Sequence, residues 1–207
     1  MDLKINGAIE ATADVVKALN EATEDVTLVI NSPGGSVLEG LQVVNAIRNC
    51  KQKVTAKVEV MACSMGGVVA LACHRLIMHK DDLLMLHNCM SYAEGNKEEI
   101  ANAIESMKAI DAVLHSIVME HAKDKTLDAR IDNGEVWLTG EQAAAMFDHV
   151  TIEEAAKKPD MVAVAGFAGV IHKLRDLEAE KREAERKANY KVPEDLQALL
   201  DSADKLE

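Results

Sequence analysis

Residues 61–67 read MACSMGG, a stretch that falls where a predicted strand gives way to a predicted helix. The strand is indicated by VTAKVEVMA at 54–62, which is rich in β-branched residues, and the helix runs from about Met65 to Ala72. Ser64 therefore has two interpretations. It is either the N-cap of this helix, which is the commoner role of an isolated serine, or a nucleophile exposed at a strand-to-helix turn.

The glycines of SPGG, at 32–35, belong to a second turn of the same kind one crossover earlier. They follow the β-branched run DVTLVIN and precede a helix that begins near Val37. Ligands bind at the carboxyl end of an open α/β sheet, and glycines there present bare backbone N–H groups that can stabilise an oxyanion. The N–H of Met65 has no partner within its helix and can face the same oxyanion as Gly35.

Strands and helices alternate through the first part of the chain, which predicts right-handed βαβ crossovers, a largely parallel sheet and the α/β class. A long helix is expected over 97–123, where apolar residues recur every three or four positions. TGEQAAAMF predicts a short helix with Thr139 as N-cap and Gln142 in a capping box. The final part of the chain is dense in Glu, Lys and Arg. We therefore expect a folded domain at 1–168 and a charged helical extension at 169–207.

The composition excludes several classes of partner. The chain has a formal net charge of −12, which opposes binding to nucleic acids and anionic membranes, and only 2% aromatic residues for stacking on bases. The four cysteines form no CxxC pair, so we expect reduced thiols rather than a disulfide framework or a zinc site. No signal peptide or membrane-length apolar run is visible, which predicts a cytoplasmic protein. No cofactor and no metal are expected.

A serine nucleophile needs a base, and LMLHNCM at 84–90 supplies His87 at the end of a short predicted strand. The spacing from Ser64 lets the next strand bring this histidine alongside. A lone histidine among apolar residues is more often part of the core, so position favours His87 only modestly. Four other histidines compete for the role, the last two of them expected on the long helix: His74, His79, His115 and His121.

Four motifs occur in order along the chain: NSPGGSV, ACSMGG, LMLHNCM and GEVWLTGEQAAA. Together they resemble the caseinolytic protease family, ClpP and its relatives, over about residues 28–155. The resemblance implies the ClpP/crotonase-like ββα superhelix with a protruding handle helix, and a serine endopeptidase without a cofactor. It implies that Ser64 is the nucleophile and His87 the base. The oxyanion hole is then formed by Gly34, Gly35 and Met65.

The resemblance also bears on the acid of the triad. In the family the acid precedes an aromatic residue and a helix start, and counting back from Trp137 puts Glu135 at this position. The family pattern has an aspartate there. A glutamate can orient and stabilise the histidine equally well, because the role needs a carboxylate near the second ring nitrogen. Asp132 is the alternative if the loop is shifted, and Glu135 is favoured.

The chain departs from the housekeeping pattern of the family. The segment before LVIN is short, His87 is followed by Asn-Cys, and a charged extension follows the resemblance. These features look closer to the ClpP-like proteases of bacteriophages and prophages, which are associated with head assembly and maturation. The implied partners are a peptide or protein substrate, phage capsid or scaffold proteins, and further copies of the chain in a ring or stacked rings.

The predicted helix at 97–123 resembles the handle helix that joins two rings in this family. It has more apolar positions than one face of a monomer can bury, which predicts contact with another copy. Three other functions stay open. They are a housekeeping ClpP peptidase that works with an ATPase, a crotonase-fold acyl-CoA enzyme, and a ClpP-like fold kept as a non-catalytic assembly module.

Overall fold

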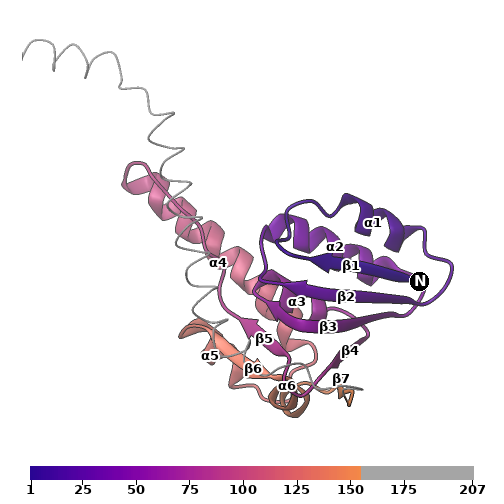
Figure 1. Cartoon of the computed structure of the whole chain (residues 1–207). Coiled ribbons are helices and arrows are strands. Elements are labelled where there is room, and N and C mark those ends of the chain that lie inside the picture. The colour runs from indigo at the N-terminus through magenta and orange to yellow at the C-terminus, as the bar shows by residue number, and fades with distance from the viewer. Residues whose placement is uncertain (155–207) are drawn as a thin grey trace, which may run out of the picture. The chain divides into compact units, whose positions relative to one another are not determined.

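The computed structural model describes residues 1–154 (Figure 1). The expected boundary between residues 168 and 169, and the charged helix of 169–207, lie outside the described residues. Among residues 1–154, no helix combines the length and the apolar character that crossing a membrane requires. The elements follow in this order: β1 (Asp2–Asn6), α1 (Ala13–Asn20), β2 (Val26–Ser32), α2 (Val37–Asn49), β3 (Val54–Cys63), α3 (Met65–Leu71), β4 (Arg75–Met78), β5 (Leu83–Leu86), α4 (Lys97–Met119), α5 (Leu127–Asp132), β6 (Val136–Thr139), α6 (Gly140–Met146) and β7 (Val150–Ile152).

The strands form a sheet in which parallel pairs dominate. Its main path is β1-β2-β3-β4-β7, while β5 pairs in parallel with β3 and antiparallel with β6. Because β1 to β4 are neighbours in chain order and each is joined to the next by a helix, right-handed crossovers place α1, α2 and α3 on one face of the sheet (Figure 1). The expected α/β class is confirmed.

The core is aliphatic, as the scarcity of aromatic residues requires. Alternate residues of β2 and β3, among them Leu28, Ile30 and Val58, have no exposed surface. A fully buried side chain of this size contributes about 1.5–3 kcal/mol to stability. All seven residues of α3 are buried, and this helix packs on β2, β3, β4 and β5. The turn before α3 is therefore held on a rigid base.

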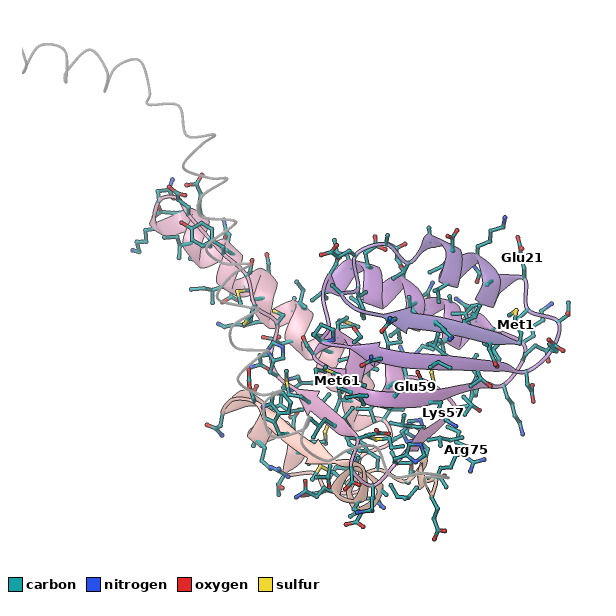
Figure 2. All side chains as sticks on the ribbon, in the orientation of Figure 1. Met1, Glu21, Lys57, Glu59, Met61 and Arg75 are labelled. Carbon is teal, nitrogen blue, oxygen red and sulfur yellow. The ribbon has the colours of Figure 1, made fainter. Side chains whose placement is uncertain are left out.

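β3 changes partners along its length. Its first half pairs with β4, and its last three residues pair with β5. Between these segments the alternation of buried and exposed residues breaks, because Glu59 and Val60 are both exposed. Val60 also has a φ of 77°, which is unusual for a β-branched residue. Figure 2 labels Lys57, Glu59 and Met61, which are every second residue of β3 across this break.

Asp82 holds the break in β3 in place. One of its carboxylate oxygens accepts the N–H of Val60 at 3.2 Å, and the other accepts the N–H of His79 at 2.7 Å. Asp82 is only 7% exposed. Burial raises the pKa of this carboxyl, although the two hydrogen bonds act in the opposite direction. The carboxylate thus satisfies backbone donors at the point where β3 turns from β4 toward β5.

Helix α4 projects away from the sheet (Figure 1) and ends earlier than expected. Its last residue is Met119 rather than residue 123, so His121 lies beyond the helix. The short helix α5 was not predicted from the sequence. The capping box at the start of α6 is confirmed: Thr139 accepts the N–H of Gln142, and the Gln142 side chain accepts the N–H of Thr139.

Candidate active site

Ser64 is the single residue between β3 and α3, and its backbone is strained. Its φ of 54° and ψ of −126° lie in a region that residues other than glycine rarely adopt, at a cost of about 1–3 kcal/mol. Its N–H donates to the carbonyl of Met85 at 2.8 Å, which fixes the turn against β5. Although Ser64 occupies the N-cap position of α3, its side chain makes no capping hydrogen bond. The interpretation of this hydroxyl as a helix cap is wrong.

The Ser64 hydroxyl lies beside His87. The distance between Ser64 Oγ and His87 Nε2 is 2.7 Å, which suits a hydroxyl that donates to an unprotonated ring nitrogen. The parallel pairing of β3 with β5, in which Cys63 faces Met85, brings the carboxyl ends of the two strands together. Ser64 follows the first strand and His87 the second, and both are partly buried. This arrangement can generate a serine nucleophile.

The other histidines considered as bases have other partners. His74 Nδ1 accepts the N–H of Val54 at 3.1 Å, and His79 Nδ1 lies 2.8 Å from the carbonyl of Glu153. His121 pairs with Asp148. His115 lies on α4, where its Nδ1 is 2.6 Å from Asp128 Oδ1 and its Nε2 is 2.7 Å from Asn88 Oδ1. The link between His115 and the residue that follows His87 had no signal in the sequence, because it joins elements far apart in the chain.

Glu135 and Asp132 lie on the segment that leads into β6. Glu135 directly precedes the strand, and its Oε2 accepts the indole N–H of Trp137 at 2.9 Å. Asp132 is the last residue of α5. Its Oδ1 accepts the side-chain N–H of Asn88 at 3.3 Å and lies 3.9 Å from His115 Nε2. The two carboxylates are therefore held in different surroundings.

The SPGG turn packs directly against Ser64. A Cβ added to Gly34 would lie 2.6 Å from Cβ and 3.0 Å from Oγ of Ser64, and Gly34 has a φ of 106°. Only glycine allows this approach. The Gly34 N–H, however, donates to Ser32 Oγ at 3.1 Å. The resemblance predicts Gly34 among the oxyanion donors, but this hydrogen bond gives its N–H another acceptor.

Two other backbone N–H groups remain near the turn. The bridge between Gly35 and Ile9 is made by two hydrogen bonds, from the N–H of Ile9 to the carbonyl of Gly34 and from the N–H of Ser36 to the carbonyl of Ile9. Neither bond uses the N–H of Gly35, which has no acceptor in the described part of the chain. Met65 is the first residue of α3, so its N–H has no acceptor within the helix. Two such donors beside a serine hydroxyl are what an oxyanion hole requires.

Two of the cysteines are poor nucleophiles. Burial raises the pKa of the Cys73 thiol to about 12. Burial and the hydrogen-bonded neighbour Asp111 raise that of Cys89 to about 11. Both thiols stay protonated at neutral pH, and the thiolate is the reactive form of cysteine. Neither competes with Ser64 for a nucleophilic role.

Comparison with known proteins gives consistent matches. A family model described as Clp protease matches residues 6–151. The chain is 29% identical over 170 residues to an ATP-dependent Clp protease proteolytic subunit of Leuconostoc citreum. This match covers 75% of the chain and 84% of the relative. It is 30% identical over 128 residues to the subunit of the same description from Carsonella ruddii, with 58% and 66% covered. For the corresponding Bacteroides fragilis protein the identity is 27% over 136 residues, with 63% and 66% covered.

Proposed function

Because the chain belongs to the Clp protease family, we propose that it is a serine peptidase in which Ser64 is the nucleophile and His87 the general base. The observation that carries this proposal is the 2.7 Å distance between Ser64 Oγ and His87 Nε2. The strained backbone at Ser64 supports it, because strain at a residue with no capping role calls for a functional reason.

In the proposed reaction, His87 takes the hydroxyl proton as Ser64 Oγ attacks the carbonyl carbon of the scissile peptide bond. The N–H groups of Gly35 and Met65 donate to the oxyanion of the tetrahedral intermediate. His87 then gives the proton to the leaving amine, which yields an acyl-enzyme on Ser64. A water molecule, deprotonated by His87, releases the acyl group by the same route. Gly34 serves here as the residue that lets the SPGG turn approach Ser64.

Glu135 is the carboxylate that we assign to the proposed triad. β5 and β6 are antiparallel, and Leu86 faces Val136 at the end of the pairing. Extending this register by one residue beyond the paired strands would put His87 opposite Glu135. Side chains of directly opposed residues lie on the same face of an antiparallel pair, with Cβ atoms about 4.5–5.5 Å apart. Asp132 lies three residues further from the strand and has Asn88 and His115 as partners, which argues against the alternative.

The role of Ser64 is tested by labelling with a fluorophosphonate probe and by hydrolysis of a fluorogenic peptide and of casein. Replacing a triad nucleophile lowers turnover by about 10⁶-fold, so Ser64→Ala should lose both labelling and hydrolysis. Ser106→Ala is the matched control, because Ser106 is an exposed serine on α4 that bonds only to the carbonyl of Asn102 among the described residues. Activity retained by Ser64→Ala would refute the proposal.

The acid is tested by two isosteric variants. Glu135→Gln keeps the shape of the side chain but removes the charge that stabilises the imidazolium, and a change of this kind lowers turnover by about 10⁴-fold. Asp132→Asn should have a much smaller effect. If Asp132→Asn were the more damaging change, Asp132 would replace Glu135 in the triad, and the roles of Ser64 and His87 would stand.

We further propose that the peptidase acts in phage or prophage head maturation. The glutamate at position 135, the Asn-Cys after His87 and the charged sequence of 169–207 support this role. The relatives named above are ATP-dependent subunits, so partnership with an ATPase is the competing role. Incubating the protein with prohead proteins and mapping the cleavage products by mass spectrometry separates them. Cleavage without ATP favours head maturation, and cleavage only with a Clp ATPase and ATP favours the other role.

We also propose that the chain assembles into rings, with residues 1–168 as the protease domain and 169–207 as an extension. Large apolar side chains are exposed along α4, including Ile100, Ile104 and Val113. The loop before this helix adds Met90 and Tyr92. A long helix that carries such residues away from the sheet offers a surface that a second copy can cover.

A further inference from the structure

His121, Asp148 and His149 form a cluster outside the candidate active site. His121 lies two residues beyond the end of α4, and the other two directly precede β7. One nitrogen or oxygen atom from each residue lies within 4.8 Å of the corresponding atoms of the other two. The exposed Asp148 gives the cluster an opening to solvent.

The backbone holds the two segments of the cluster together. Ala122 and Phe147 form an isolated antiparallel bridge, and the N–H of Asp148 donates to the carbonyl of His121 at 3.0 Å. The N–H of Lys123 donates to the carbonyl of Met146 at 2.8 Å. Phe147 is fully buried and anchors the second segment in the core. The three side chains are therefore brought together by the fold rather than by chance contact of loops.

The ring nitrogens of His149 have only weak polar contacts within residues 1–154: Asp148 Oδ1 lies 3.7 Å from Nδ1, and the backbone of Leu71 is a weak hydrogen-bond partner. The His149 side chain is 7% exposed, and within residues 1–154 neither Nδ1 nor Nε2 makes a hydrogen bond of good geometry. Buried polar groups are nearly always well paired, so a buried imidazole without a hydrogen bond of good geometry calls for an explanation. The ring stacks on that of His121, with centroids 3.9 Å apart and planes at 28°. Stacking satisfies neither nitrogen.

We infer that His121, Asp148 and His149 bind a divalent transition-metal ion of the zinc type. Two imidazoles and one carboxylate are ligands that zinc accepts, with a solvent molecule as the fourth. Ligand atoms of a tetrahedral zinc ion with bonds of 2.0–2.1 Å are about 3.4 Å apart. The distances from Asp148 Oδ1 to Nδ1 of His121 and of His149 are 3.0 and 3.7 Å and bracket this value. The two stacked rings would turn slightly to share the ion.

Such an ion would tie the end of α4 to the segment that enters β7, at the edge of the sheet. Its role would be structural, because the cluster contains neither Ser64 nor His87. A ligand that binds only the folded chain raises the unfolding temperature. Failure of this inference leaves the proposed peptidase untouched.

The test uses the untagged full chain, freed of metal with a chelator and titrated with Co²⁺. Wild-type protein should show visible ligand-field absorption that saturates at one ion per chain, is displaced by Zn²⁺ and accompanies a rise in unfolding temperature. Asp148→Asn and His121→Gln should each weaken Co²⁺ binding by at least about 100-fold, since even residues that only support metal ligands contribute 10- to 100-fold. Asp148 is exposed, so its variant should fold.

Asp81→Asn and His79→Gln are the matched controls. Both residues lie in the turn between β4 and β5, outside the cluster, and their replacement should leave Co²⁺ binding unchanged. Two results would overturn the inference. One is wild-type protein without ligand-field absorption, and the other is Asp148→Asn protein that binds Co²⁺ as tightly as wild type. Either would make the two rings a stacked pair with a packing role alone.

Discussion

Gly34 lies against Ser64 so closely that a Cβ at position 34 would sit 2.6 Å from the Cβ of the serine. The SPGG turn and the Ser64 turn thus form one packed unit. Gly35 follows Gly34 directly, so the contact that excludes a side chain at position 34 also constrains where the Gly35 N–H lies. The geometry of the proposed oxyanion hole therefore depends on Gly34, whose own N–H donates to Ser32 Oγ.

Gly34→Ala should damage activity far more than stability. The φ of 106° costs an alanine about 1–2 kcal/mol, and the added methyl group must push the two turns apart. A misplacement of about 1 Å near a reacting centre can lower turnover by about 100-fold. Peptide hydrolysis and thermal unfolding measure the two effects. Gly7→Ala is the matched control, because Gly7 also has a positive φ, of 87°, but open space around its Cβ position. Equal activity losses in both variants would contradict the prediction.

Asp82→Ala should destabilise the protein by about 2–4 kcal/mol, because it leaves the N–H groups of Val60 and His79 without their acceptor. Urea unfolding measures the change. Among residues 1–154 the neighbouring Asp81 pairs only with the exposed Lys80, so Asp81→Ala should stay within about 0.5 kcal/mol of wild type. An Asp82→Ala variant as stable as wild type would show that water can replace the carboxylate at the break in β3.

Asp82 also predicts a pH dependence of stability. Burial raises its pKa in the folded state above that of the unfolded chain, so the folded protein binds this proton more tightly. The stability contributed by the protonated form is complete below the unfolded pKa, about 4, and declines as the pH rises toward the folded value. The unfolding free energy of wild type minus that of Asp82→Asn should therefore fall as the pH rises above about 4. Urea titrations of both proteins at several pH values measure this difference in unfolding free energy. A difference that stays constant or rises with pH would contradict the prediction.

Ile104→Glu should weaken assembly. Ile104 is 48% exposed on α4, and burial of such a side chain against another copy contributes about 1.5–3 kcal/mol per contact. The dissociation constant should rise by about 10- to 100-fold at each such contact. Light scattering at several concentrations measures the mass. Ser106→Glu introduces the same charge on a different face of α4 and serves as control. A wild-type chain that is monomeric at micromolar concentration would contradict the ring proposal itself.

The turns of the candidate site could be predicted because each carries a local signal. SPGG and ACSMGG place glycines directly after β-branched strands, and parallel neighbouring strands bring their carboxyl ends together. The spacing of the strands allowed His87 to lie beside Ser64 but favoured it only modestly over the other histidines, and the family resemblance supplied the assignment. The start of α6 was predictable for the same reason, because a capping box is formed within four consecutive residues.

Other features depend on contacts that no local pattern records. The break at Val60 arises because β3 has two partners, and the hydrogen bond of Gly34 depends on the rotamer of Ser32. His121 was expected on the long helix, because the apolar spacing continues past the residue at which the backbone leaves it. Its proximity to His149 comes from a single bridge between Ala122 and Phe147.

The antiparallel pairing of β5 with β6 has a consequence for how this chain could lose its proposed activity. Side chains alternate between the two faces of a strand, so a slip of one residue between β5 and β6 would move the proposed acid, Glu135, to the face opposite the one that the proposed triad requires, while leaving the residue in the sequence. A related chain that kept every proposed catalytic residue but gained or lost one residue between α5 and β6 is then expected to be inactive. To predict whether a related chain is active, the number of residues between α5 and Trp137 must therefore be compared, as well as the presence of a carboxylate at the position of Glu135.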